Sequence, residues 1–203
     1  MLKTKNIYLV RHGKVEGKPA LNGSTDVLVA TETQQQIKQA LQAYPVEFDQ
    51  VITSPLKRCY DVATLYSKDS NVGMSSDPRF QEMNFGDVDG VPFDDLTQQW
   101  NELEQFWQDP ANHALSGAES LHSFRERVLS GWSHVLESSG DNILLVTHGG
   151  VIRALLAHAL NIDWTNPSWY SNLSIANASI THIKITHADQ DFISVKSIGL
   201  ALL

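Results

Sequence analysis

The residues best suited to chemistry in this chain directly follow a short apolar run at positions 7–10. Arg11 offers a planar, permanently charged set of donors that suits phosphoryl oxygens. His12 offers an imidazole that can be neutral near pH 7 and act as a nucleophile, and Gly13 lets the backbone approach a ligand closely. Such a group at the end of a strand suits a site that binds an anion and attacks it. Two polar residues can also end a strand without any function.

A second predicted strand, over residues 142–147, ends in the same way, in His148 followed by Gly149. Ligands of α/β proteins lie outside the carboxyl ends of the strands, so parallel neighbours of this kind bring both histidines to one crevice. A helix that starts at Gly149 or Gly150 directs free N–H groups and the positive end of its dipole toward the same place. The sequence therefore predicts an anion site between these two strand ends.

A third predicted strand, residues 51–54, supplies a second arginine. It runs into Ser54-Pro55, a helix-start signal with serine as the cap and proline at the first helical position. Arg58 then falls on the first turn of that helix, again at the carboxyl side of a strand. Taken alone, Arg58 is typical of an exposed helix residue. Together with Arg11 and the two histidines, it predicts a cationic pocket of the size of a phosphate group.

These segments need a sheet and helices to position them, and the apolar periodicity predicts both. Helices are expected over residues 31–44, 54–66, 94–107, 121–135 and from 149 onward, and strands over 7–10, 51–54, 142–147, 179–185 and 192–198. In one helix the apolar side, which includes Trp100 and Trp107, is expected to pack into the core. No repeat or linker interrupts the chain, so residues 1–203 are predicted to form a single α/β domain.

The composition excludes several classes of protein. The chain has 203 residues, of which 42% are hydrophobic and 19% charged, and this is typical of a globular fold. Its net charge of -8 argues against binding to nucleic acid or to an anionic membrane surface, and no apolar run is long enough to span a membrane. The lone cysteine, Cys59, cannot form an internal disulfide and suits a reducing compartment, so a cytoplasmic location is expected.

Beyond these physical arguments, a series of motifs resembles the histidine phosphatase superfamily, also called the phosphoglycerate mutase-like group. In chain order the motifs are Arg11-His12-Gly13, Ser54-Pro55-Leu56-Lys57-Arg58, Glu82 with Gly86 and Asp89-Gly90, Gly117-Ala118-Glu119-Ser120, and Thr147-His148-Gly149-Gly150. The resemblance extends over most of the chain. It implies a three-layer α/β fold in which a mostly parallel central sheet has helices on both faces.

The resemblance also implies roles for the site residues. His12 is expected to be the nucleophile that becomes phosphorylated, Glu82 the proton donor that later accepts a proton, and His148 a further catalytic residue. The residues expected to bind the phosphoryl group of the substrate are Arg11, Arg58, His148 and Gly149. No cofactor or metal ion is expected, because the histidines of the chain show no ligand spacing typical of metal sites.

Departures from the mutase pattern favour a hydrolase. Mutases of this superfamily carry Glu or Gln after the Arg-His-Gly motif and Asn four positions later, whereas this chain has Lys14 and Lys18. The short link to Gly23-Ser24-Thr25-Asp26 resembles the α-ribazole phosphatase branch, which removes a 5′-phosphate in cobalamin nucleotide-loop assembly. The expected partner is a small phosphomonoester, α-ribazole 5′-phosphate, and the one protein partner considered is a second copy of the chain, as a homodimer. The alternatives are a phosphoglycerate mutase, a sugar-phosphate phosphatase, and a phosphate-binding module without turnover.

Overall fold

Strand β1 (Thr4–Arg11) lies inside a six-stranded sheet with the strand order β3-β2-β4-β1-β5-β6. The computed structural model describes residues 3–203. The other strands are β2 (Gln50–Thr53), β3 (Met74–Ser76), β4 (Asn142–Thr147), β5 (Ser179–Thr186) and β6 (Phe192–Ala201). Strands β1 to β4 are parallel to one another, and β5 runs antiparallel to its two neighbours, β1 and β6. The sheet is thus mostly parallel, as the sequence predicts.

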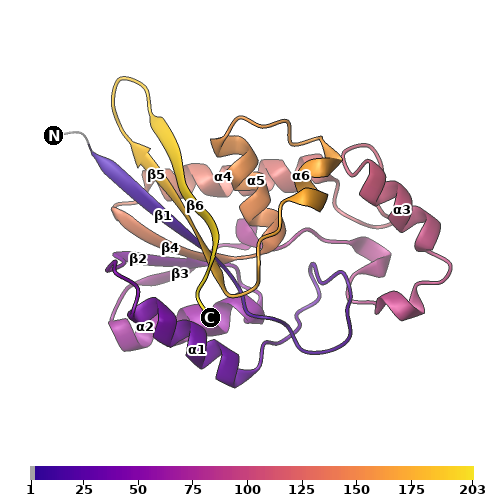
Figure 1. Cartoon of the computed structure of the whole chain (residues 1–203), viewed down its shortest axis with the longest axis horizontal. Helices are drawn as coiled ribbons and strands as arrows, with labels where there is room; N and C mark the ends of the chain where they lie inside the picture. Colours follow the sequence, from indigo (N-terminus) through magenta and orange to yellow (C-terminus); the bar gives the residue numbers. More distant parts are fainter. Residues whose placement is uncertain (1–2) are drawn as a thin grey trace.

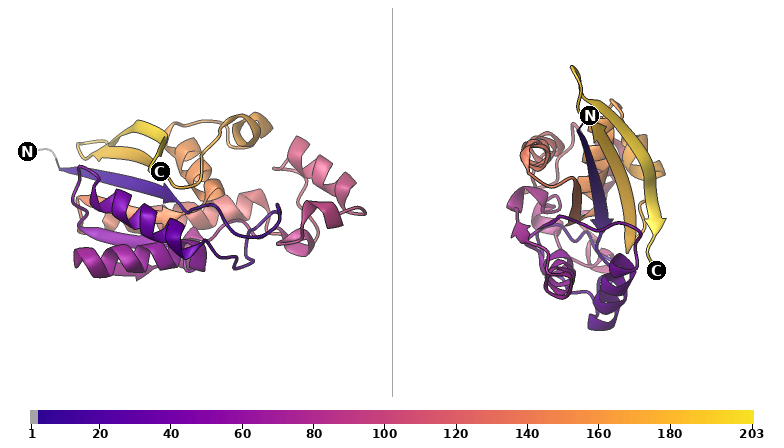
Figure 2. Two further views of the ribbon diagram at one scale, coloured as in Figure 1. Left: turned by 60° about the horizontal axis from the view of Figure 1, so that its bottom comes forward. Right: turned by 90° about the vertical axis from the view of Figure 1, so that its left-hand side faces the viewer.

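Helices cover both faces of this sheet (Figures 1 and 2). Helices α1 (Thr31–Gln42) and α2 (Lys57–Ser70) pack on one face, and helices α4 (Leu121–Glu137) and α5 (Gly149–Ala159) pack on the other. The alternation along β1 explains the arrangement, because Ile7 and Leu9 pack against α4 and α5 whereas Tyr8 and Val10 pack against α1 and α2. The three-layer prediction is confirmed. No helix within residues 3–203 is long and apolar enough to cross a membrane.

Several short elements connect the strands and the longer helices. They are three 3₁₀ turns, η1 (Pro78–Phe80), η2 (Gly86–Val88) and η3 (Phe93–Asp95), and two helices, α3 (Trp100–Gln108) and α6 (Pro167–Asn172). Figure 1 shows α3 and α6 near each other at the right-hand end, and the two helices are in contact. The periodicity does not predict α6, although Asn166-Pro167 has the form of a helix start and the Asn166 side chain accepts a hydrogen bond from Ser168 N at 3.0 Å.

The helix predicted around the two tryptophans is shorter, and its buried side is different. It begins at Trp100, because Leu96 has left the helical conformation (φ -91°, ψ 42°) and is buried in the core from the preceding turn. The buried side chains of α3 are Leu103 and Phe106, whereas Trp100 and Trp107 are 43% and 41% exposed. The prediction that both tryptophans pack into the core is therefore wrong.

The start of α2 also differs from the prediction. The helix begins at Lys57 and not at the proline, and Leu56 is its N-cap residue. The Ser54 hydroxyl oxygen accepts a hydrogen bond from Leu56 N at 3.3 Å, so the serine stabilises the turn before the helix. Arg58 nevertheless lies on the first turn of α2, as predicted.

The carboxyl ends of β1, β2 and β4 form one edge of the sheet. The register pairs Arg11 of β1 with Thr147 of β4, and Thr53 of β2 with Val146 of β4. His12 N continues the ladder past the end of β1 and donates to Thr147 O at 3.2 Å. The segments that carry the two predicted histidines and arginines therefore start side by side.

Candidate active site

His12 directly follows the last residue of β1. Its imidazole is buried, and a hydrogen bond fixes its tautomer. Nδ1 is 2.7 Å from the carbonyl oxygen of Gly13. Because a carbonyl only accepts, Nδ1 carries the proton and Nε2 keeps the lone pair. Burial, followed by the positive charges of Arg58 and Arg11, lowers the pKa of His12 to about 3. The imidazole is therefore neutral at neutral pH and has the form that a nucleophile needs.

This lowered pKa predicts an acid-sensitive fold. In the unfolded chain His12 takes up a proton below about pH 6.5, whereas in the folded protein its pKa is about 3. The unfolded state therefore binds more protons between these values, and stability falls as the pH falls, by up to about 1.4 kcal/mol per pH unit from this group. In His12→Asn we expect the free energy of unfolding, measured with urea from neutral to acidic pH, to decline less steeply. Equal slopes in the two proteins would exclude His12 as a source of the effect.

Arg11 brings a positive charge and a free donor to the same place. One of its terminal nitrogens donates to the carbonyl oxygen of Ile175, but its Nε is buried and has no hydrogen-bond partner within the described part of the chain. Gly149, at the start of α5, lies against the guanidinium, since a Cβ there would be 3.4 Å from Arg11 Nε. The N-cap residue of α5, His148, makes no side-chain hydrogen bond to the first turn of the helix. A buried arginine donor beside a helix N-terminus suits a phosphoryl oxygen.

Arg58 is fully buried and not exposed on its helix. Its terminal nitrogens donate to the carbonyl oxygens of Asn22 at 3.0 Å, Gly23 at 2.6 Å and Thr25 at 2.8 Å, and its Nε donates to His148 Nδ1 at 3.2 Å. These bonds fix the guanidinium and leave one of its five N–H groups for a ligand. The positive charge thus stays close to His12.

The loop that supplies these carbonyls is itself held by Asp89. The carboxylate accepts hydrogen bonds from Ser24 N at 2.8 Å, Thr25 N at 2.9 Å and Phe85 N at 3.0 Å. Burial alone would raise the pKa of Asp89, but these hydrogen bonds outweigh it and hold the pKa below its usual value. The sequence motif includes Asp89 without giving it a role. The geometry shows that it shapes the loop that orients Arg58.

His148 lies beside the nucleophile, with its ring centroid 5.2 Å from that of His12. It is completely buried, and both ring nitrogens are engaged: Nδ1 accepts from Arg58 Nε, and Nε2 is 2.8 Å from Ser54 Oγ. Burial, with the charges of nearby groups, holds the pKa of His148 well below its usual value. A direct contact with a phosphoryl group would require the ring to exchange one of these partners. That role stays a prediction, while the observed contacts show His148 supporting Arg58.

Glu82 comes from the loop between η1 and η2 and reaches the start of α5. Its Oε2 accepts a hydrogen bond from Gly150 N at 3.0 Å, and its Oε1 accepts one from Met83 N at 3.2 Å. Gly150 has to be glycine for this approach, because a Cβ there would be 2.3 Å from Glu82 Oε1. The carboxyl group is therefore held at the helix end that also lies against Arg11.

These groups line a cavity of about 480 Å³. Within residues 3–203, no group of three or more His, Cys, Asp and Glu side chains is placed to hold a metal ion. The cavity gathers four of the predicted site residues and two exposed lysines from the loop after β1, whereas His148 and Gly149 are not among the residues that line it. The six charged or titratable residues that line it are Arg11, His12, Lys14, Lys18, Arg58 and Glu82.

A second cavity, of about 390 Å³, adjoins the first and shares Leu21, Glu82 and Phe85 with it. Its wall is mainly apolar and aromatic. Trp107, whose side chain the sequence assigns to the core, is part of this wall. The other apolar residues of the wall include Met83, Phe106, Pro110, Leu121 and Phe124. Glu82 therefore lies where a cationic cavity meets a mainly apolar one, whose wall also includes Arg153.

A buried neutral histidine with two arginines at the carboxyl edge of a mostly parallel sheet is an arrangement that suits phosphoryl transfer. The family model for the histidine phosphatase superfamily (branch 1) matches residues 7–197, and the chain belongs to this family. It is thus a histidine phosphatase superfamily enzyme, in the class that contains phosphatases and mutases.

Three similar proteins illustrate the range of this class. A putative phosphoserine phosphatase 2 from Hydrogenobacter thermophilus is 31% identical over 166 residues, which are 80% of this chain and 82% of that protein. The adenosylcobalamin/alpha-ribazole phosphatase of Escherichia coli is 29% identical over 77% of this chain and 79% of that protein. The structure of Bacillus stearothermophilus YhfR superposes with a TM-score of 0.85 at 22% identity and covers 97% of this chain and 98% of that one, which shows the shared fold.

Proposed function

We propose that this protein hydrolyses phosphomonoesters through a phosphohistidine at His12. In the first step His12 Nε2 attacks phosphorus, the bond from phosphorus to the leaving oxygen breaks, and the Glu82 carboxyl gives its proton to that oxygen. In the second step the Glu82 carboxylate takes a proton from water, and the water oxygen displaces the imidazole from phosphorus. Inorganic phosphate leaves, and both side chains return to their starting forms.

One observation carries this proposal: Nδ1 of His12 is tied to a carbonyl, so Nε2 has its lone pair in a cavity that also contains two arginines and a carboxyl group. The charge of a phosphoryl transition state spreads over its equatorial oxygens, and fixed cationic donors stabilise it there. Arg11 supplies such donors from the end of β1, and Arg58 supplies them from the first turn of α2. In the proposal, the first N–H groups of α5, at Gly149, provide a further contact, and the mechanism uses no cofactor.

For the substrate, we propose α-ribazole 5′-phosphate. Two observations support this choice: the similarity to the Escherichia coli enzyme whose name includes this activity, and the apolar cavity next to Glu82. The base of α-ribazole is a methylated benzimidazole, which is aromatic and uncharged. Aromatic and aliphatic walls stabilise such a group by burying it, whereas the small charged leaving group of a phosphoglycerate gains little from them.

Trp107 and Trp100 offer a matched test, because both lie on α3 with similar exposure and only Trp107 lines the apolar cavity. We expect Trp107→Ala to raise the KM for α-ribazole 5′-phosphate about 10-fold, as expected for loss of one aromatic contact of about 1.4 kcal/mol, and to leave the KM for a small alkyl phosphate unchanged. Trp100→Ala should change neither. Steady-state kinetics of both variants on both substrates measures this, and equal effects of the two changes would contradict the assignment of the cavity.

A substrate panel tests the proposed function itself. We expect kcat/KM for α-ribazole 5′-phosphate to exceed the values for phosphoserine, 3-phosphoglycerate and glucose 6-phosphate. A higher kcat/KM for one of the other three compounds would show that this compound, and not α-ribazole 5′-phosphate, is the substrate. The protein would still be a phosphatase. Transfer of the phosphoryl group between positions of phosphoglycerate would identify a mutase, and tight binding without turnover of any compound would contradict the enzymatic proposal.

A further inference from the structure

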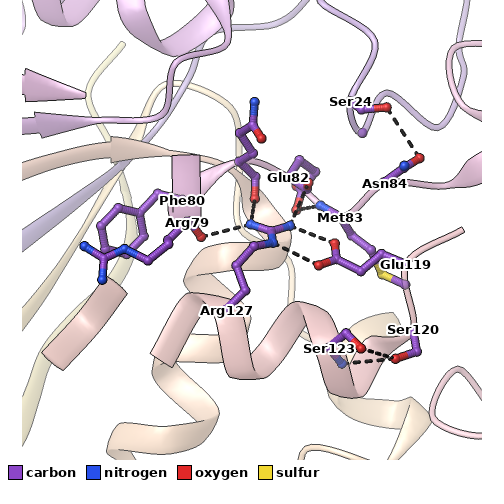
Figure 3. A network of polar contacts seen from close by, with 12 residues as sticks. Ser24, Arg79, Phe80, Glu82, Met83, Asn84, Glu119, Ser120, Ser123 and Arg127 are labelled. Carbon is purple, nitrogen blue, oxygen red and sulfur yellow. Dashed lines mark hydrogen bonds and ion pairs between the residues drawn. The ribbon is translucent and has the colours of Figure 1, made fainter. Parts of the chain in front are cut away.

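Arg127, on α4, makes a set of hydrogen bonds that have no part in the two proposed reaction steps. Its guanidinium donates through Nη1 to Arg79 O and Gln81 O, both at 2.9 Å, and through Nη2 to Glu82 O at 3.2 Å. Nη2 and Nε also donate to the two carboxylate oxygens of Glu119 at 2.7 and 2.9 Å. Figure 3 shows the guanidinium at the centre of this network, between the Glu82 segment and Glu119.

These contacts use all five guanidinium N–H groups. No donor remains for a phosphoryl oxygen, and Arg127 lines neither the cationic nor the apolar cavity. The side chain is therefore placed to hold the protein and not to bind the substrate. What it holds is the backbone of the residue that the proposed mechanism uses as its proton donor.

The segment around Glu82 needs such support, because it belongs to no strand or α-helix. Four consecutive carbonyl groups, from Arg79 to Glu82, accept hydrogen bonds from side chains: three from Arg127, and the remaining one, Phe80 O, from Thr147 Oγ1 at 3.0 Å. Backbone groups without partners in regular structure need partners of this kind when water is excluded. The conformation of the loop thus depends on a few side chains.

Glu119 fixes the network from the other side. Its carboxylate accepts hydrogen bonds from Nε and Nη2, along one edge of the Arg127 guanidinium, and its backbone N donates to Asn84 O at 3.0 Å. Arg127 and Glu119 together therefore hold the chain on both sides of Glu82. This gives a physical reason for the motif Gly117-Ala118-Glu119-Ser120, which the sequence contains and the reaction leaves unexplained.

We propose that Arg127, braced by Glu119, is a positioning residue that sets the place of the Glu82 carboxyl group at the leaving oxygen of the substrate. The inference rests on the proposed function, in which Glu82 donates that proton. An error of about 1 Å in such a group costs about 100-fold in rate. Lysine cannot replace this arginine, because a compact ammonium group has three donors and no planar fork.

The test uses the different needs of two leaving groups. An alkoxide requires a proton as it leaves, whereas p-nitrophenolate is stable without one. We expect Arg127→Lys to lower the rate of the phosphorylation step, measured in a single turnover, about 10- to 100-fold on the best alkyl phosphomonoester of the panel. The same rate on p-nitrophenyl phosphate, measured as the burst of p-nitrophenol, should change less than about 3-fold, with the substrate affinity unchanged on both. In a Glu82→Gln background the same change should have no further effect on the alkyl substrate, because the group that it positions no longer donates a proton.

Two further variants separate positioning from general destabilisation. Arg125→Lys is the matched control on the same helix, because the Arg125 guanidinium lies over the Trp164 ring at 5.2 Å and donates to none of the carbonyl groups of the Glu82 segment. This change should leave both substrates unaffected. Glu119→Gln keeps the size of the side chain and should reproduce the selective loss even if Arg127→Lys does not fold.

The outcomes are distinguishable. Equal losses in the rate of phosphorylation by both substrates, no loss on either, or an undiminished loss in the Glu82→Gln background would overturn the positioning role. If Glu82→Gln itself slows phosphorylation by both substrates equally, the proposed role of Glu82 as proton donor fails and the inference fails with it. If the unaltered protein hydrolyses no phosphomonoester, the proposed function is what fails.

Discussion

Replacing His12 by asparagine is expected to lower kcat by roughly 10⁴-fold or more on every phosphomonoester. Asparagine keeps an N–H that can donate to the Gly13 carbonyl, which now accepts from His12 Nδ1 at 2.7 Å. It provides no lone pair on nitrogen that can attack phosphorus, so the covalent step is lost while the local contact is retained. Steady-state assays with p-nitrophenyl phosphate and with the best alkyl substrate measure the effect.

His122 provides the control for this change. It lies on α4 with its side chain 62% exposed, and its contacts are with Glu126 on the same helix and, edge to face, with the Trp164 ring. His122→Asn should therefore retain the full activity. Thermal unfolding of both variants checks that they are folded at the assay temperature. Normal turnover by a folded His12→Asn protein would contradict the assignment of His12 as the nucleophile.

The second large effect is expected at Glu82. Glutamine has the same shape and can still accept the hydrogen bond that Gly150 N now donates at 3.0 Å, but it cannot donate an acidic proton. We expect Glu82→Gln to lower kcat on alkyl phosphomonoesters about 10²- to 10⁴-fold. On p-nitrophenyl phosphate, bond cleavage should be far less affected, because that leaving group needs no proton.

The same carboxylate acts as the base in the second step, so the variant should show a burst on p-nitrophenyl phosphate. One equivalent of p-nitrophenol is released quickly, and hydrolysis of the phosphoenzyme then limits the rate. Stopped-flow absorbance records both phases. Glu126→Gln, at a side chain that is 66% exposed, is the control and should behave as the unaltered protein. A uniform loss on both substrates without a burst would show that Glu82 is not the acid and base.

The positions of Arg11, His12 and Arg58 follow from the sequence because Arg11 ends a short apolar strand, His12 follows it, and Arg58 lies on the helix that begins after another such strand. Parallel strands of one sheet end at a common edge, so the site can be located from local patterns alone. Glu82 is different, because the segment that carries it has no apolar period. Only the spacing of Gly86, Asp89 and Gly90 distinguishes it, and that spacing has a meaning only by resemblance to a family.

The contacts that hold the site could not be predicted in this way. Arg127 contacts carbonyl groups 45 to 48 positions earlier in the chain, and a carbonyl carries no residue-specific signal. Nor does the sequence identify the partner of His12 Nδ1, which is the carbonyl of its own neighbour, Gly13. The burial of Arg58 likewise depends on a loop that hydrogen bonds to Asp89 hold in place. The two ring nitrogens of His148 are occupied by partners from other segments, Arg58 and Ser54.

Trp107 shows the limit of a helical pattern. The spacing of α3 correctly indicates an amphipathic helix, but the helix starts later than expected because Leu96 enters the core before it. The buried side is consequently that of Leu103 and Phe106, and Trp107 turns to the wall of the apolar cavity. A shift of this kind changes a core residue into one that can contact a substrate.

The central claim, a phosphohistidine at His12, can be tested most directly by trapping it. Glu82→Gln should be mixed with excess p-nitrophenyl phosphate, denatured within the burst phase at neutral to alkaline pH, and analysed by intact mass and by peptide mapping. We predict the mass of one phosphoryl group per chain, located on His12 and absent from the Glu82→Gln protein that also carries His12→Asn. Release of p-nitrophenol without phosphate on the protein, or with phosphate on another residue, would contradict the account.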